Sequence, residues 1–334
     1  MKPFFLFFSA ALLGAAPPAP QPAAPAAPNP AAAADPAQQP APEGVAIDLG
    51  KDAWQRMTVP VSIDGSGPYK FIVDTGAERT VIARELAQNL KLDSSGPARL
   101  YSMSEVSNVD TVLIPSLGVG GKQYRDIKAP ALDQRNLGAE GMLGVDALQS
   151  QRVSFDFAHH AMTVVASHRR EESWEPDAIV VSAKSRFGHL ILVDASVEGQ
   201  KVWVIVDTGA QGTVGNSALR HALERHHKLP EPTPVTMVSV TGGRVVADAT
   251  VIRSIRLGQA FIRDMPVAFA DVEPFRKLDL MNRPALLLGM DALKLFDRVS
   301  VDFANKSVRL LAPGHSRADP ETRMAANQAR GRRI

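Results

Sequence analysis

The sequence contains no cysteine among its 334 residues. Disulfide bonds, thiolate metal sites and a cysteine nucleophile are therefore excluded. It also lacks an excess of charge of either sign, because 37 basic and 35 acidic residues leave a net charge of +2. This balance gives no reason to expect nucleic acid or an anionic membrane as the main partner.

Patterns for metal and phosphate binding are missing as well. The histidines of "AHHAM" (158–162) and "ERHHKLP" (224–230) lack an acidic residue at the i, i+4 spacing that would predict a zinc site. The stretch "GVGGK" (118–122) lacks the spacing and the Ser or Thr of a phosphate-binding loop, and it predicts a hairpin turn instead. We expect no metal and no cofactor.

The N-terminus carries only a short apolar run. It follows Lys2 and ends in small residues, a pattern typical of an export signal, so we predict a signal peptide at 1–16, with an uncleaved anchor as the alternative. Ten of the 25 prolines lie in 15–43, and we expect 17–43 to be an extended tether. The basic 313–334 segment is expected to be a solvated tail. The protein would then be periplasmic or secreted.

An internal repeat organises the remaining chain. "YKFIVDTGAERTV" (69–81) and "VWVIVDTGAQGTV" (202–214) match at eight of thirteen positions. "GMLGVDAL" (141–148) corresponds to "LLLGMDAL" (286–293), and "RVSFDFAHHAMTVVA" (152–166) corresponds to "RVSVDFANKSVRLLA" (298–312). The order is the same in both copies, and an insertion in the second copy is placed at 271–285.

Both copies predict the same mostly β lobe, at 44–167 and 178–312, joined by a charged linker at 168–177. Each lobe should open with a β-hairpin, turning at Asp64-Gly65 in one copy and at Glu198-Gly199 in the other. A short helix should follow each Asp-Thr-Gly, at 83–90 and 216–227, with Asn216 or Ser217 as the N-cap of the second.

The repeated aspartate indicates a paired-carboxylate site. Two carboxylates within hydrogen-bond reach share a proton, so one can activate a water while the other protonates a peptide carbonyl oxygen. One copy supplies a single carboxylate. Two copies packed about a pseudo-two-fold axis would bring Asp74 and Asp207 together.

These motifs resemble the aspartic proteases of the retropepsin and pepsin kind, and the resemblance covers nearly all of 45–312. It rests on the two "DTGA" segments, on "MLG" (142–144) and "LLG" (287–289), and on their order. It implies two retropepsin-like β-barrel lobes and these roles: catalytic Asp74 and Asp207; supporting loop residues Thr75, Gly76, Thr208 and Gly209; close strand passage at Gly144 and Gly289; substrate contacts at Ala77, Ala210, Gly242 and Gly243.

The family also clamps its substrate with β-hairpin flaps. "SVTGGRVVADATV" (239–251) has a suitable tip at Gly242-Gly243, because glycine adopts positive φ readily. "SMSEVSNVDTVLI" (102–114) has no glycine and no tip aromatic, so we expect the two flaps to be unequal, with the second one doing most of the closing.

Other acidic and polar positions have plainer interpretations. We expect Asp146 and Asp291 to cap short helices and Asp156 and Asp302 to have structural partners only. Two further loop residues stay open between contacting the substrate backbone and being solvated: Glu78 and Gln211.

The main hypothesis is an aspartic endopeptidase acting on polypeptides as a monomer. The alternative is a peptide-binding or sensory protein that keeps the fold with little turnover. A third arrangement, in which each lobe pairs with its twin in another chain, is disfavoured by the short linker.

Overall fold

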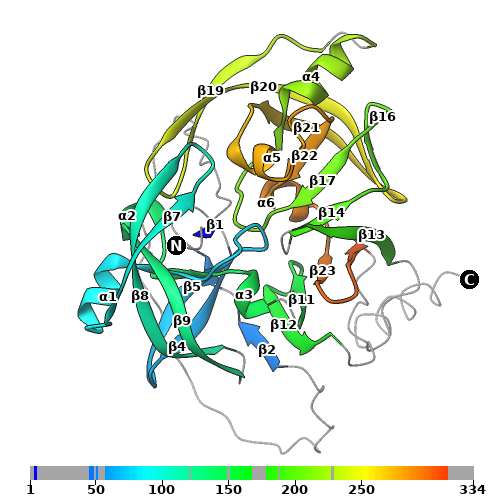
Figure 1. The fold of residues 1–334 in the computed structure, drawn as a ribbon. Helices are drawn as coiled ribbons and strands as arrows, with labels where there is room; N and C mark the ends of the chain where they lie inside the picture. The colour runs from blue at the N-terminus through cyan, green and yellow to red at the C-terminus, as the bar shows by residue number, and fades with distance from the viewer. Residues whose placement is uncertain are drawn as a thin grey trace, which may run out of the picture.

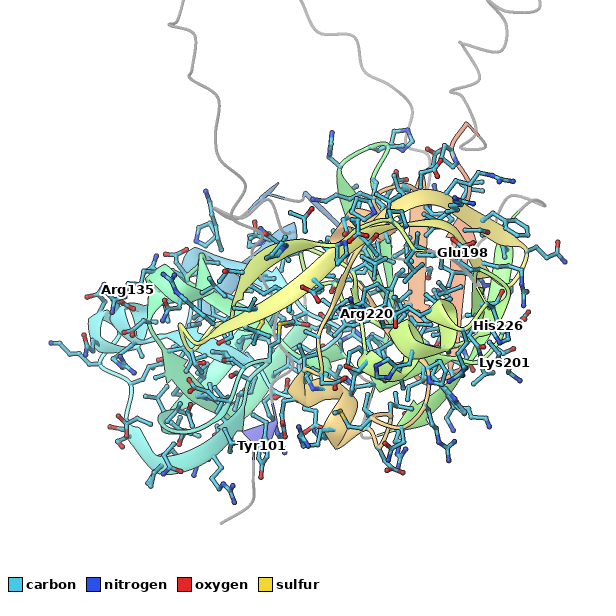
Figure 2. All side chains as sticks on the ribbon, turned by 90° about the horizontal axis from the view of Figure 1, so that it is seen from above. Tyr101, Arg135, Glu198, Lys201, Arg220 and His226 are labelled. Carbon is cyan, nitrogen blue, oxygen red and sulfur yellow. The ribbon has the colours of Figure 1, made fainter. Side chains whose placement is uncertain are left out.

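The computed structural model describes residues 4–5, 45–48, 50–51, 57–119, 122–148, 151–167, 178–186, 189–226 and 229–314. The predicted tether and charged linker lie outside these ranges, as do the predicted signal peptide apart from residues 4–5 and the basic tail apart from residues 313–314. Figure 1 shows two lobes rich in β-strands, and in Figure 2 they lie side by side, with Arg135 on the first and Lys201 on the second. The mostly β fold is as predicted.

The first lobe is built from strands β4 (Met57–Ile63), β5 (Ser66–Val73), β6 (Val81–Ala83), β7 (Ser94–Tyr101), β8 (Val106–Val119), β9 (Lys122–Leu132) and β10 (Gly141–Leu143). Its helices are α1 (Arg84–Asn89), α2 (Gln134–Leu137) and α3 (Val145–Leu148). Two short strands, β1 (Phe4–Phe5) and β3 (Gly50–Lys51), add to the ends of its sheet. Because β8 pairs with both β9 and β4, the strands β4, β8, β9, β6, β10 and β5 close into a barrel.

The second lobe is a wide sheet. Its strands are β14 (His189–Leu192), β15 (Ala195–Val197), β16 (Gln200–Lys201), β17 (Trp203–Val206), β18 (Val214–Gly215), β19 (Thr233–Val238), β20 (Arg244–Leu257), β21 (Ala260–Phe269) and β22 (Ala285–Leu288). Its helices are α4 (Ser217–Glu224), α5 (Glu273–Lys277) and α6 (Met290–Leu293). The single β4 of the first lobe corresponds here to two strands, β14 and β15, with different neighbours.

Local sequence signals place several of these elements. Both predicted hairpin turns form, and Asp64, Gly65, Glu198 and Gly199 all have positive φ, as tight hairpin turns require. Asn216 is the N-cap of α4, and its side chain accepts a hydrogen bond from the Leu219 N–H at 2.9 Å.

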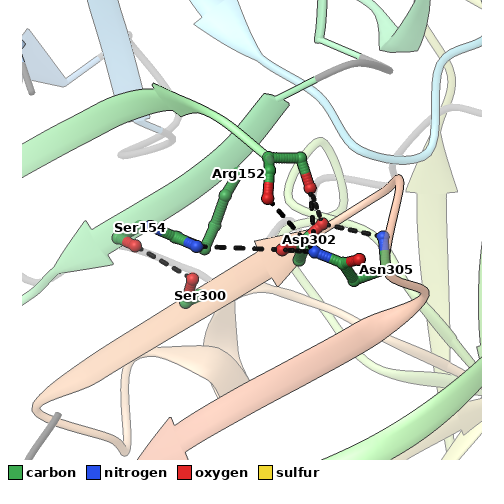
Figure 3. Close-up of polar contacts among 6 residues, drawn as sticks. Arg152, Ser154, Ser300, Asp302 and Asn305 are labelled. Carbon is green, nitrogen blue, oxygen red and sulfur yellow. Dashed lines mark hydrogen bonds and ion pairs between the residues drawn. The ribbon is translucent and has the colours of Figure 1, made fainter. Parts of the chain in front are cut away.

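A shared antiparallel sheet joins the lobes in the order β13 (Ile179–Arg186), β24 (Ser307–Leu311), β23 (Arg298–Asp302), β11 (Gln151–Asp156), β12 (Ala161–Ala166) and β2 (Val45–Asp48). The two "RVS" strands, β11 and β23, are neighbours at its centre. Ser154 lies opposite Ser300, and their hydroxyls are hydrogen-bonded at 2.9 Å (Figure 3). The pseudo-two-fold axis therefore passes between these two serines.

Reciprocal ion pairs flank this central pair. Arg152 lies opposite Asp302, at 3.9 Å between Nη1 and Oδ2, and Arg298 lies opposite Asp156, at 3.1 Å between Nη2 and Oδ2. Asp302 also accepts hydrogen bonds from Ser167 and Asn305. The structural partners expected for Asp156 and Asp302 are confirmed.

The apolar core continues from one lobe into the other. Its buried members include Phe71, Phe155, Leu192 and Val299. A second cluster, around Ile205 and Phe275, lies in the second lobe but also contains Met103 of the first. Among the described helices, none is both long and apolar enough to cross a membrane.

Candidate active site

Two equivalent strand ends position the repeated aspartates. Asp74 follows β5, and Asp207 follows β17. In each lobe the strand of the Leu-Gly motif runs parallel beside it, and the aspartate N–H donates to the last residue of that strand, at 3.0 Å to Leu143 and 3.1 Å to Leu288. Both aspartates are fully buried.

Backbone N–H groups hold each carboxylate in place. Oδ1 of Asp74 accepts hydrogen bonds from Gly76 at 2.7 Å and Ala77 at 3.0 Å. Oδ1 of Asp207 accepts them from Gly209 at 2.9 Å and Ala210 at 3.0 Å. The loop residues therefore fix the orientation of the carboxylates through their backbone.

The glycine of each loop lies against the carboxylate of the other lobe. A Cβ atom added to Gly76 would stand 2.5 Å from Cγ of Asp207, and one added to Gly209 would collide with the carboxylate of Asp74. Any larger residue would push the two loops apart. The structure thus brings Asp74 and Asp207 into one site, as the repeat predicted.

The threonines cross-brace the two loops. The Thr75 hydroxyl donates to the Val206 carbonyl at 3.0 Å and accepts from the Thr208 N–H at 3.1 Å. The Thr208 hydroxyl donates to the Val73 carbonyl at 2.8 Å and accepts from the Thr75 N–H at 3.0 Å. These four buried bonds fix the separation of the aspartates.

The Leu-Gly motifs support the loops from behind. A Cβ atom at Gly144 would overlap the backbone of Arg79, and one at Gly289 would stand 2.5 Å from the carbonyl oxygen of Gly212. The next residue in each copy, Val145 or Met290, donates its N–H to the alanine of the DTGA loop at 2.7 Å. The close strand passage implied by the resemblance is confirmed.

Asp146 and Asp291 do not occupy the N-cap positions that we predicted for them. Both lie inside the first turn of their helices, and the N-cap of α6 is Gly289. Their carboxylates accept hydrogen bonds from the N–H and the hydroxyl of Thr80 and of Thr213. Burial raises the pKa of both carboxyl groups. Each threonine lies four residues after the DTGA glycine, and each carboxylate also accepts a first-turn N–H, from Ala147 or Ala292. These aspartates therefore tie the loop to the helix.

Both lobes form a hairpin at the place predicted for a flap, including the glycine-free segment of the first lobe. The first hairpin joins β7 to β8 through a turn in which the Ser102 N–H donates to the Glu105 carbonyl at 2.9 Å. The second joins β19 to β20, and the Ser239 N–H donates to the Gly243 carbonyl at 2.8 Å. Gly242 has a φ of 85°, as expected for its tip.

Four hydroxyl groups join the two tips in a closed ring. Ser104 donates to Ser239 at 2.9 Å, Ser239 lies 2.8 Å from Thr241, Thr241 donates to Ser102 at 3.2 Å, and Ser102 lies 3.3 Å from Ser104. In Figure 1 the long hairpin of β19 and β20 arches toward the hairpin of β7. We call these four residues the hydroxyl ring.

The residue between the hydroxyls is apolar in both tips. Met103 and Val240 are each only 2% exposed. Met103 belongs to the cluster of the second lobe, and its carbonyl accepts the Glu273 N–H at 3.2 Å. The sequence analysis missed a shared pattern of the two tips. Ser-Met-Ser (102–104) and Ser-Val-Thr (239–241) each place an apolar residue between two hydroxyl residues.

Glu78 and Gln211 occupy equivalent places behind the loops. Their carbonyl groups accept the N–H of Asp146 at 3.3 Å and of Asp291 at 3.0 Å. The Glu78 carboxylate forms an ion pair with Lys277, which decides against a solvated role. In the described part of the chain, no three His, Asp or Glu side chains gather in a way that could hold a metal ion.

Comparison with known proteins agrees with this geometry. A family model described as aspartyl protease matches residues 59–147 and 193–292, so one match falls on each lobe and contains its DTGA loop. No curated protein matches the chain. The two matched regions cover more than half of the sequence, and the chain belongs to the aspartyl protease family.

Proposed function

We propose that this protein is an aspartic endopeptidase whose dyad is Asp74 and Asp207. The observation that carries the proposal is the reciprocal approach of each loop glycine to the opposite carboxylate. This contact supports a dyad in which two buried acids share a proton. The ionised member takes a proton from a water, which attacks the peptide carbon, and the protonated member donates to the carbonyl oxygen.

The substrate is an extended polypeptide bound between the lobes and covered by the two flaps. Hairpins offer free backbone groups that can align a peptide as an added strand. Four loop and tip residues are proposed to contact it: Ala77, Ala210, Gly242 and Gly243. The apolar Met103 and Val240 would exclude water when the flaps close.

Hydrolysis of unfolded casein between about pH 3 and pH 7 tests the activity, because a shared-proton dyad works only while one carboxyl is ionised. We expect fragments from the wild-type protein and none from Asp207→Asn, with Asp248→Asn as a control that changes a half-exposed carboxylate outside the two loops. Equal cleavage by wild type and Asp207→Asn would refute the dyad.

A peptide-binding protein with little turnover is the second candidate. It is favoured by the hydroxyl ring, which links the two flap tips directly to each other. Such a protein would bind casein peptides and cut them under none of the conditions tested. Its affinity for these peptides would be the same in the wild type and in Asp207→Asn.

We further propose that the protein is exported and monomeric. Export rests on the apolar N-terminal segment and would be tested by fractionating cells that express the full chain. A monomer is supported by the pairing of β11 with β23 within one chain, because the second copy already supplies the two-fold partner. Light scattering would decide between this state and a dimer that loses activity on dilution.

A further inference from the structure

A buried charged cluster lies behind one catalytic loop. It consists of Glu78, which follows the first DTGA, and of His189 and Lys277 from the second lobe. Oε1 of Glu78 forms an ion pair with Nζ of Lys277 and lies 3.6 Å from Nε2 of His189. The side chain of His189 is 0% exposed and that of Lys277 is 6% exposed. We call these three residues the ion cluster.

The ion cluster is found at one loop only. The residue equivalent to Glu78 in the second lobe is the neutral Gln211, although the backbone bonds of the two positions are the same. Lys277 is the last residue of α5, which lies in the connection between β21 and β22, a longer connection than the one between β9 and β10 in the first lobe. This connection therefore brings a cation across the lobe boundary to the first catalytic loop.

The helix that carries Lys277 is held firmly. Phe275 is fully buried in the cluster of the second lobe, and the Glu273 N–H donates to the Met103 carbonyl of the first flap. His189 interacts with the backbone of Thr75, the neighbour of Asp74. The ion cluster thus reaches both the first catalytic loop and, through α5, the first flap.

The ionisation of the cluster follows from burial. Burial lowers the pKa of Lys277 to about 8, so the amine is charged at acidic and neutral pH. Burial also lowers the pKa of His189. For Glu78, burial acts to raise the pKa, but the hydrogen bonds and charges of His189 and Lys277 bring it below its ordinary value.

The other charged groups near the cluster are occupied elsewhere. On α5, Arg276 pairs with Glu273 at 3.1 Å, and beside Glu78 the Arg79 guanidinium lies 4.0 Å from Asp146. Strand β14 contributes no titratable residue besides His189. Asp146 lies at the first loop as Asp291 does at the second, so the buried charges that distinguish the first loop are those of Glu78, His189 and Lys277.

We propose that the ion cluster acts as a set of positioning residues that makes the two catalytic aspartates electrostatically unequal and so sets the pH range in which they share one proton. The proposal rests on the function proposed above. A buried charge acts over a longer range than an exposed one, because little water screens it. The ion cluster acts mainly on Asp74, since the second loop has no equivalent cluster.

The test is the pH dependence of kcat/KM for a peptide that the wild-type protein cleaves. Lys277→Met removes a positive charge, which should move both limbs of the profile to higher pH, by on the order of half a pH unit. Glu78→Gln removes a negative charge and should move them to lower pH. The double variant should return toward the wild-type profile, and Lys277→Arg, which keeps the charge, should leave it in place.

Arg276→Met is the matched control, because it removes a cation from the same helix where the side chain is 61% exposed. We expect its profile to match the wild type. If Lys277→Met and Glu78→Gln lose stability while their profiles stay in place, the ion cluster is only structural and the proposal is wrong. If Lys277→Met does not fold, the shift of Glu78→Gln alone decides. Failure of the proposed function itself would be recognised separately, by activity that survives Asp207→Asn.

Discussion

The two lobes agree closely at their catalytic loops and differ around them. Both loops use the same backbone bonds to the aspartate, the same threonine brace and the same glycine behind the loop. The first lobe closes into a barrel, whereas the second is a wide sheet in which the connection that carries α5 is longer than the matching connection of the first lobe. The difference shows that pairing across the pseudo-two-fold axis constrains the loops, because each loop is the packing surface of the other.

Removing the catalytic carboxylate of one lobe should have the largest effect, and it compares the two lobes directly. We expect Asp74→Ala and Asp207→Ala each to lower kcat by roughly a thousandfold or more, since neither acid can perform both proton transfers alone. The measurement is peptide hydrolysis, with folding checked by circular dichroism. Two folded variants with very different residual activity would mean that the lobes do not contribute equally to the chemistry.

The ion pairs of the shared sheet offer a second comparison. Arg152 and Asp302 have side chains that are 8% and 6% exposed, against 28% and 18% for Arg298 and Asp156. Removing one partner of a buried pair leaves an uncompensated charge. We expect Arg152→Ala to lower the free energy of unfolding by about 3 kcal/mol and Arg298→Ala by about 1 kcal/mol or less.

Urea denaturation of both variants would measure this difference. Because the two positions are equivalent by pseudo-symmetry, each variant is the control for the other. Equal losses would show that burial does not distinguish the two pairs.

The flaps give a finer test, because the sequence predicts them to be unequal while the hydroxyl ring joins them. A Cβ atom at Gly243 would collide with the Ser104 hydroxyl. We expect Gly243→Val to lower kcat/KM about tenfold, equivalent to about 1.4 kcal/mol in the barrier. Changing Glu105 and Val106, both exposed in the first hairpin, should have much less effect.

Ser104→Ala in the Gly243→Val background is the informative control, since it removes the hydroxyl that the valine meets. Partial recovery of kcat/KM would support coupled tips. No recovery, together with a larger loss from the first-hairpin variants, would assign the closing motion to 99–114.

The smallest expected effect concerns stability against pH. Burial lowers the pKa of His189 in the folded state, so the unfolded chain takes up this proton first as the pH falls. The contribution of His189 to stability is therefore complete above pH about 6.5 and is lost as the pH falls through its folded-state pKa. Thermal melts of wild type and His189→Gln should converge as the pH falls from about 7 to about 5. A difference in melting temperature that stays constant over this range would contradict the assignment.

The sequence by itself determined the features that short segments encode. The repeat predicted two lobes, the paired aspartates and the supporting glycines, because these depend on residues within a few positions of each DTGA or Leu-Gly motif. The turn glycines and the Asn216 N-cap could also be predicted, because local backbone geometry selects those residue types.

Only the tertiary structure decided the features that need both copies at once. The hydroxyl ring joins Ser102 and Ser104 to Ser239 and Thr241, and neither half indicates by itself that a hydrogen-bond partner faces it. Glu78 pairs with Lys277 rather than with solvent, because the connection between β21 and β22 folds across the lobe boundary, a contact that the sequence did not predict. Asp146 and Asp291 lie inside the first turn of their helices rather than at the N-cap, and they bind loop threonines as well as a first-turn N–H, because the loop packs against the helix. Contacts between distant segments depend on how the lobes pack, which no local pattern specifies.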